Sequence, residues 1–400
     1  MKKHLAVMAA LIAPLPALAD TDPADWDAVT AAAEGQTVYW NAWGGSTTTN
    51  DFIAWVGERV AEDYGVTLEH VKLTDTADAV TRVLAEKQAG ENDDGAIDMI
   101  WINGANFAAM KEADLLFGPF AEQLPNWAFV DAEGKTVQTD FTVPVEGFES
   151  PWAMAQVVFV HDTADMPDTL GSMQALLDWT QANPGRFSYP QPPDFLGTTF
   201  LKQVLVDILP DPSVLAAPAT DANYDEVTAP LWAYLDELTP NLWREGKAYP
   251  ATGTAMFPLI ADGELDLSIS FSPGAASTAI ANNELPPSVR TFVLDKGTIG
   301  NASFVAIPYN SGSSEGAMVV ANFLMSPEAQ ARAQDPNILG YGTVLNMAAL
   351  SGDDRALFDA LELGVATLTP AELGTVQAEP HPSWATRIAD DWVSRYGVAQ

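Results

Sequence analysis

The residues best suited to hold a ligand lie in a loop between a β-forming run, Thr37–Trp40, and an amphipathic segment that starts at Asp51. The loop residues singled out are Trp43, Gly44, Gly45, Ser46 and Thr47. Paired glycines let a ligand approach the backbone, and N–H groups at a helix start favour an anionic group. No lysine follows the glycines, which excludes a Walker A loop. We expect Thr49 or Asn50 to cap the following helix.

A second loop, Asn103–Gly104, follows the apolar run 97–102. Asn103 either hydrogen-bonds a ligand or caps the next helix, and the sequence does not choose between these roles. Four tryptophans cluster beside the two loops: Trp40, Trp43, Trp101 and Trp152. Trp40 and Trp101 have strand positions that favour burial, whereas Trp43 lies in the loop itself. Trp43 and Trp152 are therefore predicted to face a planar or cationic ligand through stacking and cation–π attraction.

The opposite side of the predicted site comes from the middle of the chain. Tyr189, Asp194 and Phe195 belong to a loop stiffened by three prolines, and Ser272 follows a predicted strand. A single loop aspartate is usually solvated or a helix cap. Asp194 is included because a buried cationic ligand needs a counter-charge.

An enzymatic alternative rests on Gly312–Gly316, which matches the nucleophile-elbow pattern G-x-S-x-G. Asp353 and His381 follow in the expected order, so a secreted serine hydrolase using Ser314 and His381 is the alternative function. The predicted strand ends at Pro308, however, and an elbow is one tight turn. A helix start explains the serines more simply, so no catalytic residue is assigned.

Metal chemistry has little support in the sequence. The three histidines after residue 19 are His70, His161 and His381, and they show no H-E-x-x-H spacing. Cysteine is absent, which excludes disulfides, thiol catalysis and cysteine metal sites. The acidic run 92–95 lacks the spacing of a calcium loop. We therefore expect neither a metal nor a cofactor.

Strand-like and helix-like segments alternate along the chain, which predicts an α/β architecture. Predicted helices cover 51–64, 75–89, 106–113, 170–181, 198–209, 226–238, 314–325 and 384–396. Predicted strands cover 37–40, 66–71, 97–102, 156–161, 186–189, 265–271 and 302–308, and an irregular crossing covers 144–151. Ligands of such sheets bind beyond the carboxyl ends of the strands, where the Trp43 and Asn103 loops fall.

Residues 1–19 have the features of a secretory signal peptide. Lys2 and Lys3 precede a short apolar core, and Ala17–Ala19 forms a cleavage site before Asp20. We expect cleavage after Ala19 and a periplasmic mature protein. The net charge of −36 argues against nucleic acid and anionic membranes as partners. Because the acids are dispersed, solubility in a saline medium explains them better than steering of cationic ligands.

Six segments together carry a family resemblance: TVYWNAWGG, IDMIWINGANF, SPWAMAQVVFVHD, RFSYPQPPDFLG, SISFSPG and NFLMSPEAQ. The chain resembles bacterial ABC-transporter solute-binding proteins, and more narrowly the YnjB-like group of family 1 extracellular binding proteins. The resemblance implies a type II fold of two lobes, each a mixed sheet flanked by helices, with a ligand cleft at the hinge.

The resemblance also implies a division of the chain and a set of partners. Lobe 1 is expected over 20–152 and again over 302–345, lobe 2 over 153–301, and a C-terminal helical segment over 346–400. The partners are a small polar ligand, such as a thiamine-like organic cation or heterocycle, and the transmembrane subunits of an ABC permease. The protein is expected to be a monomer that meets the membrane only through the permease. A scaffold or chaperone without small ligands is a further alternative.

Overall fold

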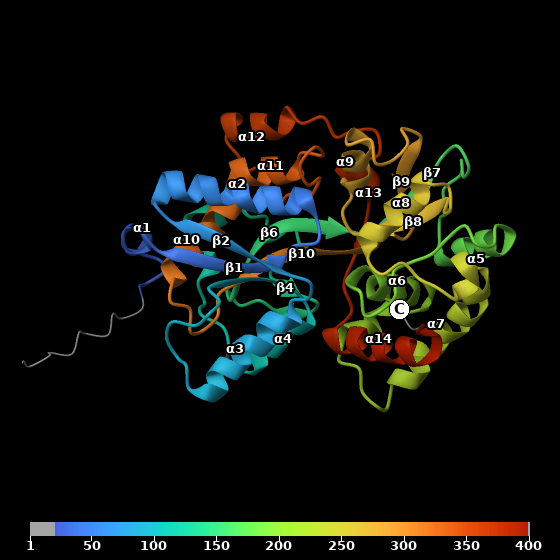
Figure 1. Cartoon of the computed structure of the whole chain (residues 1–400), viewed down its shortest axis with the longest axis horizontal. Coiled ribbons are helices and arrows are strands. Elements are labelled where there is room, and N and C mark those ends of the chain that lie inside the picture. Colours follow the sequence, from blue (N-terminus) through green and yellow to red (C-terminus); the bar gives the residue numbers. More distant parts are fainter. Residues whose placement is uncertain (1–20, 399–400) are drawn as a thin grey trace, which may run out of the picture.

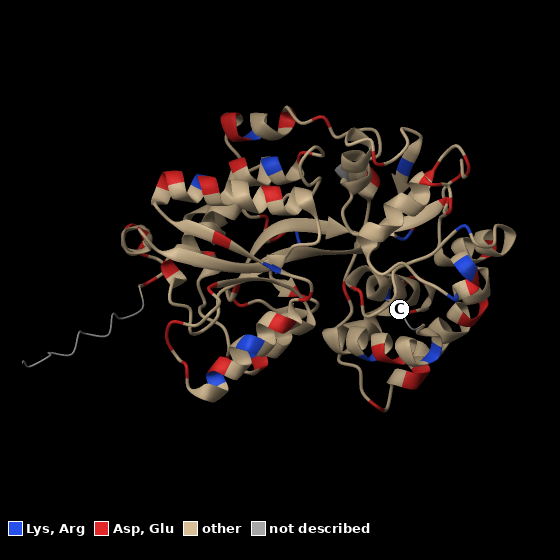
Figure 2. Ribbon diagram, in the orientation of Figure 1, with Lys and Arg blue, Asp and Glu red and all other residues tan. Residues whose placement is uncertain are grey.

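The computed structural model describes residues 21–398, and the predicted signal peptide lies outside them. The chain folds into two α/β lobes that lie side by side (Figure 1). No helix of the described part is long and apolar enough to cross a membrane. Acidic residues are spread over helices and loops of both lobes, and basic residues are fewer (Figure 2).

The first lobe is built on a six-stranded mixed sheet with the order β11-β10-β3-β1-β2, in which β6 also pairs with β10. Its strands are β1 (Thr37–Trp43), β2 (Thr67–Leu73), β3 (Met99–Ile102), β6 (Glu149–Gln156), β10 (Thr298–Ala306) and β11 (Val376–Gln377). β1 runs parallel to β2 and β3, whereas β10 runs antiparallel to β3 and β6. The carboxyl ends of β1 and β3 therefore lie at one edge of the sheet.

Helices cover both faces of this sheet, as a sheet buried on two sides requires. They are α1 (Trp26–Ala33), α2 (Thr47–Tyr64), α3 (Ala77–Ala89), α4 (Ala105–Glu112), α10 (Ser314–Leu324), α11 (Pro327–Gln334) and α12 (Gly352–Asp359). The short hairpin β4 (Thr139–Asp140) and β5 (Val143–Pro144) lies beneath the sheet near α4 (Figure 1).

The second lobe has a three-stranded antiparallel sheet with the order β8-β7-β9. Its strands are β7 (Val158–Asp162), β8 (Leu267–Ser270) and β9 (Val289–Phe292). The helices that pack around it are α5 (Met173–Ala182), α6 (Phe195–Ile208), α7 (Tyr224–Leu238), α8 (Met256–Ala261), α9 (Ala275–Ala281), α13 (Pro370–Leu373) and α14 (Pro382–Tyr396). Helix α6 is buried almost all round, since Leu196 to Asp207 are all enclosed.

Two strands pass between the lobes, and hydrogen bonds tie the crossing together. β6 leads directly into β7, and the Val157 N–H donates to the Ile299 carbonyl at 2.8 Å. The Gln156 side chain donates to the Thr298 hydroxyl at 3.1 Å. The boundaries expected at 152/153 and 301/302 fall inside β6 and β10, so the exact division of the chain remains a prediction. Farther from these strands, Gly274 N–H donates to the Gly340 carbonyl and joins loops of the two lobes.

Most predicted elements form, with three corrections. The crossing over 144–151 was expected to be irregular, but its last residues belong to β6. Glu149 pairs with Ala306, and the residues after Glu149 continue this antiparallel ladder with β10. The strand expected over 186–189 is only an isolated bridge between Phe187 and Leu267. The first predicted helix begins four residues earlier than Asp51, at Thr47.

Candidate functional site

The loop after β1 is shaped by Trp43 and two glycines. A Cβ on Gly45 would lie 2.4 Å from the Trp43 ring, so the indole rests directly on the Gly45 backbone. Trp43 and Gly44 are partly exposed, and Gly45 and Thr47 are exposed. A side chain at Gly45 would therefore displace the indole.

Ser46, and neither Thr49 nor Asn50, is the N-cap of α2, which corrects the sequence-based prediction. Its Oγ accepts a hydrogen bond from the Thr49 N–H at 3.4 Å. Thr49 is buried, and the Asn50 side chain donates to the Gly44 carbonyl at 3.2 Å, which closes the loop. The misassignment arose because several hydroxyl and amide residues in a row can cap a helix equally well.

The loop after β3 is held in place by hydrogen bonds within the protein. Asn103 donates to the Ala302 carbonyl at 2.7 Å and to the Asp140 carboxylate at 3.4 Å. The Gly104 N–H, at the start of α4, also donates to Asp140. Gly104 has φ of 59°, and a Cβ there would meet the Phe141 ring at 2.9 Å. Asn103 thus does not cap the helix, because Asp140 fills the helix start, and its contact with a ligand stays a prediction.

The remaining tryptophans form a buried aromatic cluster. Trp152 is 0% exposed and packs edge-on against Trp40 and Trp101 at ring distances of 6.2 and 4.8 Å. Phe52 stacks on it at 6.0 Å. Burial of Trp40 follows its predicted strand position, whereas Trp101 is partly exposed. Trp152, which was expected to face the ligand, is buried inside this cluster. Trp43 was expected in the loop, but β1 extends through it, so it is the last residue of the strand and is partly exposed.

Two of the residues expected to bind the ligand from the second lobe, Tyr189 and Asp194, have structural roles. Tyr189 is 0% exposed, stacks on Phe200 at 4.3 Å and accepts a hydrogen bond from the Trp392 indole at 3.0 Å. It belongs to the core of the lobe. Asp194 is the N-cap of α6, where it accepts from the N–H groups of Leu196 and Gly197.

Two of the second-lobe residues are more accessible. Phe195 is 48% exposed and lies edge-on against Phe271 at 5.2 Å. Ser272 is partly exposed, and its Oγ donates to the Leu339 carbonyl of the first lobe at 3.4 Å. Ser272 therefore lies where the two lobes approach each other.

A charged cluster between the lobes was missed by the sequence reasoning. Lys202 of α6 is 1% exposed, and its ammonium lies 2.6 Å from the Glu379 carboxylate. The same ammonium lies 4.4 Å from the centre of the Phe141 ring, which belongs to the first lobe, and 5.6 Å from the centre of the Phe195 ring. Asn301 on β10 donates to the other Glu379 oxygen at 3.2 Å. We call Lys202, Glu379, Phe141, Phe195 and Asp140 the interlobe cluster.

Carboxylates in and beside this cluster have raised pKa values. The pKa of Asp140 is raised to about 7, mainly by burial and also by Glu379, against the opposing effects of the hydrogen bonds from Gly104 and Asn103 and of Lys202. Burial also raises the pKa of Glu379, against the effect of the Lys202 ammonium beside it. Glu149, fully buried with no hydrogen-bond partner, has its pKa raised by burial and by Asp140. The interlobe region is therefore rich in acids that resist ionisation.

One signal for the cluster is present in the sequence. Lys202 is a lone basic residue within the apolar run of α6, in a chain with only 18 basic residues. A lysine inside a helix that is buried all round requires a partner. Glu379, which lies between predicted elements near Pro380 and Pro382, carries no such signal, because nothing local places it beside Lys202.

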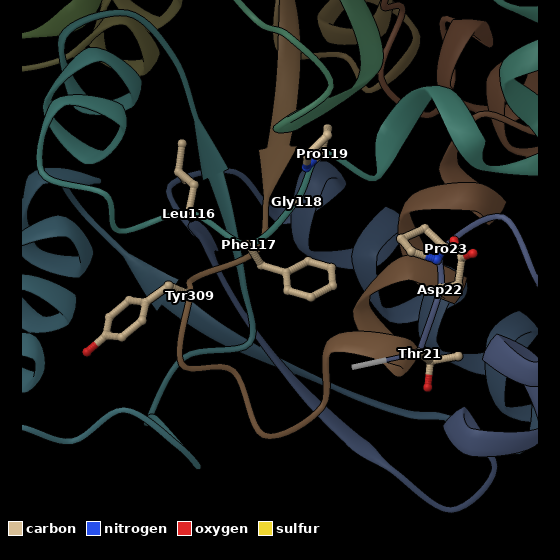
Figure 3. A pocket seen from close by; sticks show the side chains of 8 residues that line it. All are labelled: Thr21, Asp22, Pro23, Leu116, Phe117, Gly118, Pro119 and Tyr309. Carbon is tan, nitrogen blue, oxygen red and sulfur yellow. The ribbon is translucent and has the colours of Figure 1, made fainter. Parts of the chain in front are cut away.

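Two surface hollows lie away from the interlobe cluster. One, of about 390 Å³, is lined by Thr21–Pro23, Leu116–Pro119 and Tyr309 (Figure 3). In Figure 3 the Phe117 ring points from the segment 116–119 toward Thr21–Pro23, and the Tyr309 ring lies on the other side of that segment. The other, of about 600 Å³, is lined by residues of the second lobe near Tyr396. Neither contains a residue that the sequence assigned to the site.

The hydrolase arrangement is not assembled. Ser314 begins α10, His381 is the N-cap of α14, and Asp353 lies in the first turn of α12. Figure 1 shows these three helices in separate parts of the molecule. The His381 ring is hydrogen-bonded to the Ser383 hydroxyl at 2.9 Å. Within residues 21–398, no group of three or more histidines and carboxylates is placed to hold a metal ion.

Comparisons with known proteins agree with this geometry. The family model described as bacterial extracellular solute-binding protein matches residues 55–357. Protein YnjB of Escherichia coli K12 is 44% identical over 378 residues, covering 94% of this chain and 95% of YnjB.

Two solved structures illustrate the likeness in fold. The periplasmic binding protein AfuA of Actinobacillus pleuropneumoniae, with fructose-6-phosphate bound, has a TM-score of 0.62 at 13% identity, covering 91% of this chain and 99% of AfuA. The spermidine/putrescine substrate-binding protein PotD of Streptococcus pneumoniae has a TM-score of 0.58 at 15% identity, covering 90% and 98%. At such low sequence identity, the similarity shows a common fold and nothing about the solute. These structural comparisons confirm the expected α/β two-lobe fold of type II.

Proposed function

Because the chain belongs to the family of bacterial extracellular solute-binding proteins, we propose that it captures a small polar solute between its lobes and delivers it to the permease of an ABC importer. In this proposal the protein works in the periplasm as a monomer after loss of residues 1–19. N-terminal sequencing of the exported protein should begin at Asp20.

One observation carries the proposal: charged and aromatic groups from both lobes meet beside the crossing strands. Lys202 of the second lobe lies over the Phe141 ring of the first at 4.4 Å. Asn301, which holds Glu379, is on β10 itself. A solute stabilises the closed arrangement only if it contacts both lobes, so a site of this kind couples binding to closure.

For the solute we propose an organic cation or heterocycle, such as a thiamine-like compound. The Glu379 carboxylate, which pairs with a cation in this structure, supplies an acceptor, and Phe141 and Phe195 supply ring faces that attract cations. Trp43, resting on Gly45 at the end of β1, adds a larger ring. Structures with this fold are named for spermidine and putrescine as well as for fructose-6-phosphate, so the fold alone does not select the charge of the solute.

Small-angle X-ray scattering tests the proposed function. The purified protein is measured alone and with pools of organic cations, sugars, amino acids and phosphates at saturating concentration. We expect a smaller radius of gyration with at least one cationic pool and a higher melting temperature with the same pool. No compaction and no thermal shift with any pool would contradict solute capture, and a stable protein partner in pull-down would then favour a scaffold.

A further inference from the structure

The interlobe cluster contains the ammonium group of Lys202, which is almost fully buried. Lys202 is 1% exposed and comes from a helix that contributes Phe200 and Leu201 on one side of it and Val204 and Leu205 on the other to the apolar core of the second lobe. Its bond to Glu379 is the one hydrogen bond that the ammonium makes within the described chain. An ammonium has three protons to donate, so the rest of its surroundings must compensate in another way.

Rings and carboxylates provide that compensation. The ammonium lies within cation–π distance of Phe141 and Phe195, at 4.4 and 5.6 Å. Asp140 is near enough to interact electrostatically with both Lys202 and Glu379. The Glu379 carboxylate and two ring faces therefore contact one positive charge, and they come from separate segments of the chain.

This arrangement suits a cation better than an anion. An anionic group placed beside Lys202 would have to displace Glu379, which Asn301 holds at 3.2 Å. It would also approach the Asp140 carboxyl group. A cation that replaced the Lys202 ammonium would instead keep its contacts with the Glu379 carboxylate and the two rings. Lysine can vacate such a place more readily than most residues, because its charge sits on a flexible four-carbon stem.

We infer that the interlobe cluster is a cation subsite which the chain fills with its own Lys202 ammonium, and that the solute binds by placing an ammonium or other cationic nitrogen group there as Lys202 withdraws. This inference rests on the proposed function and names the chemical group by which the solute is recognised. Lys202 is then a competitor of the solute. While no solute is bound, its ammonium neutralises the Glu379 carboxylate.

The test uses Lys202→Ala, which removes the atoms equivalent to a propylammonium ion. Binding of n-propylammonium, n-propanol and propionate is measured by calorimetry and thermal shift. We expect n-propylammonium to bind Lys202→Ala at least about tenfold more tightly than n-propanol, from one ion pair and two cation–π contacts. Propionate should not bind.

Two control variants separate the subsite from general effects of salt. Lys296→Ala removes a lysine of the same lobe whose side chain is 66% exposed, so it leaves no enclosed space, and n-propylammonium should not stabilise it. Lys202→Met fills the space without charge and should exclude the ion. If Lys202→Ala is purified unfolded, refolding with n-propylammonium but not n-propanol supports the inference, and equal recovery with both or with neither overturns it.

Equal binding of n-propylammonium and n-propanol to folded Lys202→Ala, or tighter binding of propionate, would overturn the cation subsite. Failure here is distinguishable from failure of the proposed function. If the parent protein closes on a solute but Lys202→Ala shows no preference for ammonium, only the subsite is wrong. If Lys202→Ala binds n-propylammonium but no solute closes the parent, the subsite stands and the transport function is wrong.

Discussion

Replacement of Asp140 by asparagine should change how stability depends on pH. The Asp140 carboxyl group is 1% exposed, and its pKa rises from an ordinary value of 3.8 to about 7 because of burial, with Glu379 adding to the rise. The difference of about three units corresponds to at most about 4 kcal/mol. Asparagine is nearly the same size and can still accept a hydrogen bond from the Gly104 N–H.

The sign follows from proton binding. Below pH 4 the carboxyl group is protonated in both the folded and the unfolded chain, so it contributes no pH dependence. Between pH 4 and 7 the unfolded chain releases the proton while the folded protein retains it, and the free energy of unfolding falls as pH rises. Above pH 7 the loss is complete. Asp140→Asn removes this slope, whereas the parent protein keeps it.

Urea unfolding of parent and variant from pH 4 to pH 8 measures the effect. The stability of Asp140→Asn relative to the parent should rise by up to about 4 kcal/mol across this range, and any constant loss from altered hydrogen bonding cancels in the comparison. Asp211→Asn is the control, because hydrogen bonds from Ser213 lower the pKa of Asp211 and place its titration below the window. A relative stability of Asp140→Asn that is flat or falls with pH would refute the reasoning.

Three further predictions concern the Lys202–Glu379 pair, the Trp43 ring and the close approach of Gly274 to Gly340. Lys202→Met should destabilise the protein by about 3–5 kcal/mol because it leaves Glu379 buried without its partner, and Lys202→Met with Glu379→Gln should recover much of the loss in urea unfolding. Lys247→Met, which removes a pair exposed on both sides, should have no measurable effect. Trp43→Ala should weaken solute binding at least about tenfold in calorimetry without unfolding the protein, since one stacked ring is lost; unchanged affinity would remove Trp43 from the site. Gly274→Ala should cost about 1–3 kcal/mol, because its Cβ would lie 2.4 Å from the Gly340 Cα, whereas Gly352→Ala, with nothing within 4 Å, should be tolerated.

Local patterns predicted the elements well but not the contacts that join the lobes. The order of β1, its loop and α2 follows from β-forming residues, glycines and an amphipathic segment, and the apolar run before Asn103 is the parallel strand β3. These features depend on neighbours in the chain. The position of β6 was missed because its pairing with β10 joins residues about 150 positions apart.

The site was harder to predict than the fold, for the same reason. Tyr189 and Trp152 are aromatic residues near loops, yet both are 0% exposed, because aromatic side chains serve cores as readily as binding sites. Lys202 and Glu379 are 177 positions apart, and no local spacing pairs them. Asp140 was overlooked because its role depends on the helix start at Gly104, which it fills from a separate hairpin. The contacts of the remaining loop residues with a solute stay predictions.

Native mass spectrometry of the protein isolated from the cells that produce it tests the central claim most directly. We expect a population heavier than the mature chain by one small molecule, which is released on denaturation and carries a basic nitrogen group. The same molecule, added back to the emptied protein, should reduce its radius of gyration. A spectrum that shows only the bare chain, both as isolated and after incubation with a cell extract rich in metabolites, would contradict solute capture between the lobes.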